Sequence, residues 1–300
     1  RCNNIQLLDY LFAKMNLDLD YIFLKAAENK LCSIAFLTDI LRKGANINAT
    51  NDSMKTALHL LCIPQKLNFS LIEFVVEQGI YLDAQDHCKA TALHYLCSSG
   101  SYSEQKILQY LLEKGANPNL VSLDFFVSWP EECGPLITQV SQQTATSMIL
   151  LNNPKVDPFL ANPKTGNTCL HLCNKKIAEK LLSLPGVDPN VKNLAGNTPL
   201  HVCHDTEKLE ILLQHKNIQF LCNNAGESPL ETCSKFRNVR LFQRMAEDPR
   251  AGTITLTAAK KCCRYFFQMQ SDSIVELIFL LCVFSGFSPN EVAEKGFMHF

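Results

Sequence analysis

One short motif returns along this chain of 300 residues, and it constrains the fold more than any other feature. Each copy has a hydroxyl residue, a small residue or proline, then leucine, usually histidine, and a short apolar run with a cysteine. The clear copies are TALHLLC (56–62), TALHYLC (91–97), TCLHLC (168–173), TPLHVC (198–203) and SPLETC (228–233). With weaker copies at 22 and 134, successive copies start 30 to 43 residues apart. Periods of this length are typical of chains built from stacked repeats.

A second pattern keeps phase with the motif. After each copy comes an apolar segment with helical spacing that ends in a turn, as in LTDILRKGANIN (37–48) and ILQYLLEKGANPN (107–119). Glycine often follows as a helix C-cap. The hydroxyl residue of the motif suits a helix N-cap, because its side chain can accept from free backbone N–H groups. We therefore expect pairs of short helices, with the motif leucines in the core between neighbouring pairs: Leu58, Leu93, Leu170, Leu200 and Leu230.

These residues resemble the ankyrin repeat, a unit of about 33 residues with a turn, two antiparallel helices and a loop. The resemblance covers roughly residues 17–250 and implies an all-α fold, an ankyrin-repeat solenoid of about seven repeats. It implies an N-terminal half repeat at 1–16 and a helical cap, or the start of a truncated second domain, at 251–300. The repeats are expected to begin near 17, 51, 86, 129, 163, 193 and 223.

The fourth repeat departs from the pattern. It is degenerate and follows an insertion at 119–135 that holds Phe125, Phe126 and the only tryptophan, Trp129. In the family this stretch is a finger that reaches into solvent. Aromatic residues there are either anchors of a protein interface or a cover for the damaged repeat, and the sequence leaves both open.

Cysteines and histidines follow the repeat. Of the 14 cysteines, five lie at a small position of the motif and are expected to be buried: Cys62, Cys97, Cys173, Cys203 and Cys233. A histidine that recurs at one motif position, as His59, His94, His171 and His201 do, indicates a local hydrogen bond, since a catalytic pair needs one base beside one nucleophile. No CxxC pair exists, so we expect neither a metal site nor a cofactor. The weaker alternative is a cysteine hydrolase that uses Cys88, Cys133 or Cys262.

Charge and hydropathy exclude further classes. The formal net charge of −1 supplies no basic field for nucleic acid. The apolar stretch at 274–287 is too short to span a membrane and contains Glu276, although it leaves a membrane-surface module as an alternative. The N-terminus lacks the apolar core of a secretory leader and begins with Arg, so we expect a fragment of a cytoplasmic, monomeric protein.

The resemblance implies a non-enzymatic scaffold that binds a protein partner on its concave face. The implied contact residues, besides the three aromatic residues above, are Asp52, Ser53, Lys55, His87, Cys88, Lys164, Thr165, Asn167, Leu194, Ala195 and Asn197. The eroded, Cys- and Asn-rich repeats also resemble ankyrin-type effectors that intracellular bacteria deliver into host cells. Asn48, Asn119 and Asn190 resemble asparagines that some ankyrin proteins present to a hydroxylase, and the alternative is that each bonds its own turn.

Overall fold

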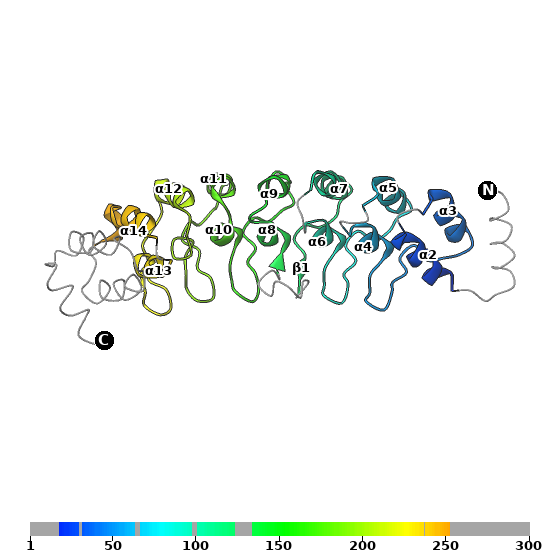
Figure 1. Cartoon of the computed structure of the whole chain (residues 1–300), viewed down its shortest axis with the longest axis horizontal. Helices are drawn as coiled ribbons and strands as arrows, with labels where there is room; N and C mark the ends of the chain where they lie inside the picture. Colours follow the sequence, from blue (N-terminus) through cyan, green and yellow to red (C-terminus); the bar gives the residue numbers. More distant parts are fainter. Residues whose placement is uncertain are drawn as a thin grey trace. The chain divides into compact units, whose positions relative to one another are not determined.

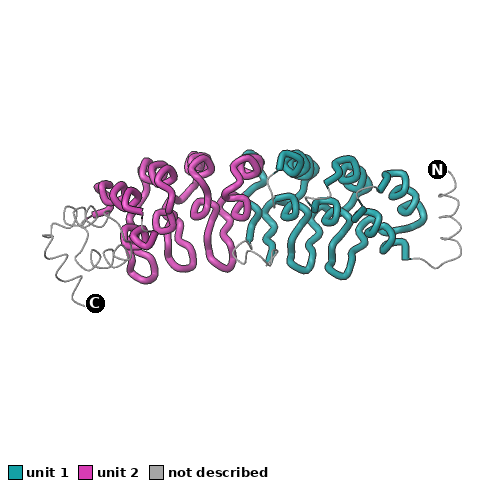
Figure 2. The backbone as a smooth tube through the Cα atoms, in the orientation of Figure 1, with its two compact units in different colours: residues 1–136, 152–156 teal, residues 137–151, 157–300 magenta. Residues whose placement is uncertain are grey.

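The computed structural model describes residues 18–29, 32–63, 67–97, 101–123, 134–236 and 238–252. These residues are mostly helical, as the sequence predicts, and their only sheet has two short strands (Figure 1). The chain divides into two compact units, residues 1–136 with 152–156 and residues 137–151 with 157–300 (Figure 2). The expected half repeat at 1–16 and nearly all of the segment 251–300 lie outside the described residues.

In the first unit, short inner helices alternate with outer helices, most of them longer. Helix α2 packs against α3 and α4, and α4 packs against α5 and α6. In Figure 1, α5 and α7 form one layer, α4 and α6 form a second, and the connecting loops project below the second layer. The bounds are α2 (Leu19–Glu28), α3 (Ile34–Arg42), α4 (Ala57–Leu61), α5 (Phe69–Glu77), α6 (Ala92–Leu96) and α7 (Tyr102–Glu113).

The second unit repeats this arrangement, but some of its inner elements are shorter than α4 and α6. Helix α11 packs against α9, α10 and α12, and α14 packs against α12 and α13. The inner helix α10 spans four residues, and residues 199–202 form only turns, whereas α4 and α6 span five residues each. The bounds are α8 (Leu136–Gln139), α9 (Thr144–Leu151), α10 (Cys169–Leu172), α11 (Lys175–Leu182), α12 (Thr206–Gln214), α13 (Pro229–Ser234), α14 (Val239–Ala246) and the 3-10 helix η2 (Pro249–Ala251).

The core lies between the two layers of each unit. All five motif leucines are buried, and so are the five motif cysteines. The apolar stripes of the outer helices face the same core through residues such as Ile72, Leu108 and Leu212. Each helix pair covers its apolar face only where a neighbouring pair is stacked on it, which is the usual source of stability in repeat proteins.

The insertion is closed at its base by the small sheet. Strand β1 (Val121–Ser122) pairs antiparallel with β2 (Gly134–Pro135), so that Val121 lies opposite Pro135. Residues 124–133 between the strands lie outside the described residues, and with them the three aromatic residues of the predicted finger. Whether those side chains form an interface or a cover stays open.

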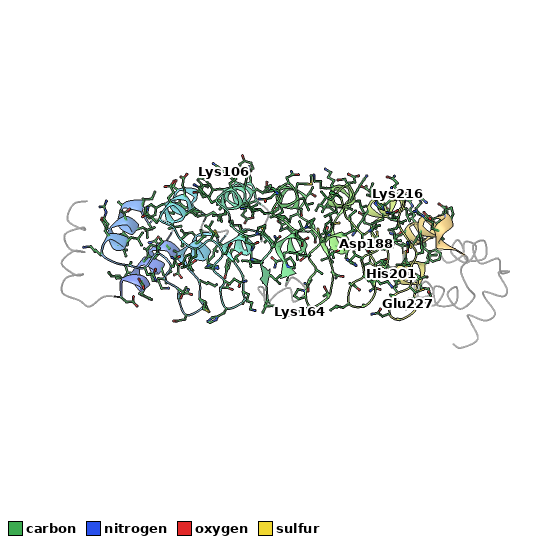
Figure 3. The ribbon with its side chains drawn as sticks, turned by 180° about the vertical axis from the view of Figure 1, so that it is seen from behind. Lys106, Lys164, Asp188, His201, Lys216 and Glu227 are labelled. Atoms are coloured by element: carbon green, nitrogen blue, oxygen red, sulfur yellow. The ribbon has the colours of Figure 1, made fainter. Side chains whose placement is uncertain are left out.

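The motif histidine joins its own repeat to the next one. The backbone N–H of Thr56 donates to His59 Nδ1 (3.1 Å), and the same contact recurs at Thr168 and His171 (3.1 Å). Because an amide N–H can only donate, Nδ1 must accept, and the proton of the neutral ring is on Nε2. That Nε2–H then donates to a backbone carbonyl in the following repeat, from His59 to Ala90 (3.0 Å), from His171 to Asn197 (3.0 Å) and from His201 to Glu227 (3.1 Å; Figure 3).

The insertion interrupts this series at His94. Its Nδ1 accepts from the Thr91 N–H (3.1 Å), as in the other copies. Its buried Nε2 makes no hydrogen bond of normal geometry within the described residues, although the carbonyls of Leu120 and Gly134 are near the ring. The acceptor in the other copies directly precedes the next motif, and the residue at that position here, Cys133, lies outside the described residues.

The loops between repeats form turns, here called the fingers, which an Asn or Asp side chain closes. Oδ1 of Asn193 accepts from the N–H groups of Ala195 (3.0 Å) and Asn197 (2.9 Å). The same double contact is made by Asn51, Asp86 and Asn223. Such Asx turns satisfy backbone donors that a loop would otherwise leave to solvent.

Backbone hydrogen bonds also link neighbouring fingers within each unit. In the first unit, the His87 N–H donates to Ser53 O (3.2 Å). In the second unit, the Leu194 N–H donates to Thr165 O (3.0 Å) and the Asn224 N–H to Ala195 O (3.1 Å). The fingers of one unit are therefore held in fixed register, and their tips form a continuous surface.

The histidine contacts predict a loss of stability in acid. Burial lowers the pKa of the four motif histidines, and it lowers the pKa of His94 and His171 to about 4. An unfolded histidine takes up its proton near pH 6.5. Stability is therefore complete above that pH and is lost as the pH falls toward 4, because only the unfolded chain binds the proton. At about pH 5, His94 and His171 each lower the free energy of unfolding by about 2 kcal/mol.

We expect urea unfolding at about pH 7.5 and about pH 5 to show this loss. His171→Ala will lower stability at the higher pH but reduce the difference between the two conditions by about 2 kcal/mol. His204→Ala, which removes an exposed ring, is the control and will leave the difference unchanged. An unchanged difference in the His171 variant would contradict the assignment.

The packing of neighbouring fingers predicts that an alanine substitution costs more stability at one of two glycines with similar φ angles than at the other. Gly196 and Gly226 have φ of 75° and 72°. A Cβ on Gly196 would lie 2.6 Å from Asn224 N, whereas no described residue lies within 4 Å of a Cβ on Gly226. Both alanine variants will pay about 1–2 kcal/mol for a left-handed backbone. Gly196→Ala will cost at least about 1 kcal/mol more, because the next finger must move. Equal losses in thermal unfolding would disprove the packing.

Candidate functional site

The fingers of the first unit present polar and apolar side chains to solvent. Asp52, Ser53 and His87 are exposed, while Lys55 and Cys88 are half-buried. Two of these side chains contact other parts of the protein. His87 Nε2 bonds Asp52 O (2.6 Å), and Lys55 Nζ lies over the Tyr95 ring, 5.2 Å from its centroid. All five residues predicted for this unit therefore lie on or beside the two finger tips.

Two residues at these tips have an unfavourable backbone. Met54 has φ of 58° and Lys89 has φ of 54°, in the left-handed region that favours glycine. The equivalent positions of the second unit are glycines, for example Gly196 and Gly226. The first unit thus places long side chains where the backbone disfavours them, and Met54 remains 48% exposed.

The sequence analysis missed Met54 and Lys89. The signal was available, because aligning the finger NDSMK (51–55) with NLAGN (193–197) places Met54 at a glycine position. Only the observed positive φ shows that the methionine keeps the glycine conformation and does not change the turn.

The fingers of the second unit expose Lys164, Leu194 and Ala195 (Lys164 is labelled in Figure 3). Leu194 is 65% exposed, so most of this apolar side chain faces solvent. The other predicted residues, Thr165, Asn167 and Asn197, are half-buried. The two asparagines accept side-chain amide bonds from the next finger, Asn167 from Asn193 (2.8 Å) and Asn197 from Asn223 (2.9 Å).

Beside these fingers, the ends of the inner elements add an aromatic contact. The rings of His204 and Phe236 meet edge to face with centroids 6.1 Å apart, and Phe236 is 42% exposed. Lys235, next in sequence, is paired with Glu227 (2.8 Å). The second unit therefore presents apolar side chains among charged and amide groups.

The three asparagines predicted as hydroxylation sites bind the turn of the following repeat. Asn48 Oδ1 accepts from the Tyr81 N–H (2.8 Å), and Asn119 Nδ2 donates to Lys155 O (2.7 Å). Asn190 donates to Asn217 O (2.8 Å) and accepts from the Gln219 N–H (2.8 Å). These contacts account for an asparagine at each position, and the hydroxylation stays a prediction.

The described residues hold no group of three or more His, Cys, Asp or Glu side chains arranged to bind a metal ion. Of the cysteines proposed for a hydrolase, Cys88 is half-buried at a finger tip, while Cys133 and Cys262 lie outside the described residues. No helix of the described part of the chain is long and apolar enough to cross a membrane.

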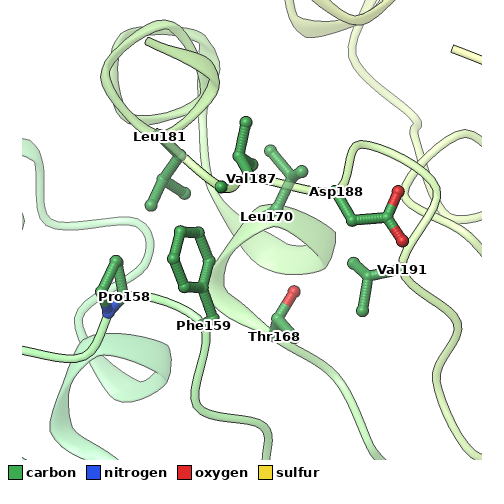
Figure 4. Close-up of a pocket in the computed structure, with 9 residues that line it drawn as sticks. Pro158, Phe159, Thr168, Leu170, Leu181, Val187, Asp188 and Val191 are labelled. Atoms are coloured by element: carbon green, nitrogen blue, oxygen red, sulfur yellow. The ribbon is translucent and has the colours of Figure 1, made fainter. Parts of the chain in front are cut away.

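One apolar pocket of about 220 Å³ opens in the second unit (Figure 4). Apart from Thr168, Gly186 and Asp188 it is lined by apolar side chains, and it is smaller than the usual small-molecule site. Its size suits a single apolar side chain. The apolar lining residues are Pro158, Phe159, Leu170, Leu181, Val187 and Val191.

Comparison with protein families accounts for this architecture. Residues 23–122 match a model of ankyrin repeats with three copies, and residues 165–194 match the single ankyrin repeat. Ankyrin repeats are generally protein–protein interaction modules and are typically not enzymes. These two stretches therefore carry ankyrin repeats, and the ankyrin repeats predicted there from the recurring motif are confirmed.

Proposed function

We propose that this chain is a non-enzymatic adaptor that binds a protein partner through its finger tips and the adjoining ends of its inner helices. The observation that carries the proposal is the backbone of Met54 and Lys89. A left-handed conformation costs a non-glycine residue about 1–2 kcal/mol, and neither side chain recovers this by burial. Backbone strain of this kind is common at functional sites, so strain that no core packing compensates points to a role of these side chains at the surface.

The fingers are also rigid before any partner binds. Asx turns close each tip, and backbone hydrogen bonds join one tip to the next within a unit. A preformed surface loses little conformational entropy on binding, so more of the contact energy appears as affinity.

The chemistry of the tips favours a protein surface over a charged polymer. In the first unit Met54 supplies exposed apolar area beside the polar residues Asp52 and Ser53, and in the second unit Leu194 does so beside Lys164. Apolar anchors within a polar rim are the common arrangement of protein interfaces. The predicted aromatic anchors Phe125, Phe126 and Trp129 belong to the same proposal, although they lie outside the described residues.

Two narrower predictions rest on the sequence alone. One is that the chain is a secreted bacterial effector that acts on a host protein in the cytosol or nucleus. The other is the competing hydrolase, for which a single thiol labelled selectively at neutral pH would be the distinguishing result. Affinity capture from a host-cell extract, with identification of the captured protein, addresses the first.

We expect Met54→Gly to separate binding from stability. Glycine relieves the left-handed strain, so the free energy of unfolding should stay within about 1 kcal/mol of the parent value. Loss of the exposed side chain should weaken binding to the purified partner by about tenfold. Leu194→Ala should weaken binding similarly. Isothermal titration calorimetry measures the affinity, and urea unfolding measures the stability.

The control is Tyr102→Ala, because Tyr102 is 83% exposed at the start of the outer helix α7. That variant should bind as the parent does. If both finger variants retain parental affinity while the Tyr102 variant loses it, the partner binds the outer layer and the proposal is wrong.

A further inference from the structure

The second unit contains a buried lysine in a place that is otherwise apolar. Lys208, in α12, is 3% exposed and is the only buried lysine of the described residues. It lies three positions after the N-cap of its helix. At the same position α5, α11 and α14 carry the buried residues Leu71, Ile177 and Leu241. A buried ammonium is costly unless other groups compensate its charge.

Lys208 has one structural partner. Its Nζ donates to His171 O (2.9 Å), a carbonyl near the C-terminus of α10. The last carbonyls of a helix have no partner within it, and in the four-residue helix α10 Leu172 O accepts from Gln142 Nε2 while His171 O accepts from Lys208. The lysine therefore caps a truncated inner helix, as cations commonly do at helix C-termini.

No carboxylate completes this arrangement. None of the ion pairs formed by the described residues includes Lys208. The groups on which its charge acts are the thiols of Cys169, Cys173 and Cys203, together with the neutral ring of His171. Glu207, the nearest acidic residue in sequence, is paired with Lys175 (3.5 Å), and Asp205 Oδ1 accepts from the Glu207 N–H (3.0 Å) at the helix N-terminus.

Two of these thiols belong to one short helix. Cys169 opens α10 and Cys173 follows its last residue, a spacing of four that places both side chains on one helix face. Each of the two thiols acts on the pKa of the other. Cys173 Sγ also lies 3.8 Å from Leu170 O, a long contact that costs little to lose.

The surroundings make Cys173 the more acidic of the two thiols. The neighbouring Cys169 thiol lowers the pKa of Cys173 and the Lys208 charge lowers it further, in opposition to burial. The neighbouring Cys173 thiol and burial raise the pKa of Cys169. Burial also raises the pKa of Cys62 and Cys97, and it raises that of Cys203 to about 11.

We propose that Cys173 and Cys169 form a peroxide-sensitive pair, in which Cys173 reacts with hydrogen peroxide and Cys169 then closes a disulfide with it. The Cys173 thiolate attacks one peroxide oxygen, so that an S–O bond forms, the O–O bond breaks, and the leaving hydroxide takes a proton to become water. The Cys169 sulfur then attacks the Cys173 sulfenic acid. An S–S bond forms, the S–O bond breaks, and the hydroxyl leaves as a second water with the Cys169 proton. Two thiols are oxidised by two electrons and one peroxide is reduced to two waters.

The disulfide requires a local rearrangement of α10. Side chains four apart on a helix have Cβ atoms about 5–6 Å apart, whereas a disulfide needs about 3.8 Å. The end of a four-residue helix must therefore tighten around Leu172, which is half-buried at the inner surface. Such a short helix also opens readily, which admits a molecule as small as peroxide to the buried sulfurs.

Peptide mapping of the folded chain tests the pair. Tryptic peptide 165–175 contains Cys169 and Cys173 and no other cysteine. After brief treatment with hydrogen peroxide and alkylation of the remaining thiols, this peptide should lose two hydrogen atoms before Cys62, Cys97 or Cys203 is oxidised. If peptide 165–175 oxidises only after unfolding in urea, the proposal is overturned.

Variants test the role of each group. Cys169→Ser should stop the reaction at the sulfenic acid, which dimedone will trap on Cys173, and equal dimedone labelling of every cysteine would disprove the selectivity. Lys208→Met should slow oxidation about tenfold and move the pH profile of Cys173 alkylation upward, because loss of the cation raises the pKa of the Cys173 thiol. Lys208→Arg, which keeps the cation, should retain much of the rate.

Circular dichroism verifies that each variant is folded, and Cys62→Ser is the matched control that should leave peptide 165–175 unchanged. If a folded Lys208→Met chain is oxidised at the parental rate, Lys208 does not activate Cys173. If that variant does not fold, the dimedone result with Cys169→Ser decides alone.

Discussion

Within each unit, a motif histidine bonds its own repeat to the repeat that follows. One ring nitrogen closes the local helix start and the other bonds the next repeat. Burial keeps the ring neutral, and the backbone N–H that donates to Nδ1 leaves the proton on Nε2. The register of the helices, and through it the register of the fingers, depends on this contact. At His94 the series is interrupted within the described residues.

The interactions within one motif were predictable from the sequence because they are local. The hydroxyl N-caps, the buried leucines and the small buried cysteines follow from residue type and position in the copy. The finger residues were predicted as a group, since the loops must lie outside the helix layers. Asn167 and Asn197 were predicted only as contact residues, because their bonds to the next finger depend on distances that no single copy contains.

What could not be predicted depends on exceptions to the repeat. Met54 is unremarkable in a loop until its positive φ is known. In the sequence, nothing distinguishes Lys208 from a lysine on the surface of a helix, and only the packing of α12 against its neighbour places it in the core. In both cases the residue violates a local preference, and tertiary contacts or surface function must compensate. The repeat pattern identifies the fold, whereas these departures distinguish this chain from others with the same fold.

Lys208 also limits how far the repeats can be treated as interchangeable modules. The four-residue helix α10 relies for its His171 carbonyl on a side chain of the following repeat and for its Leu172 carbonyl on Gln142 of the preceding one. The shortened repeat therefore depends on both of its neighbours. Transplanting residues 163–192 alone into another array would leave both carbonyls without these donors, so a transferable block must include the adjoining repeats.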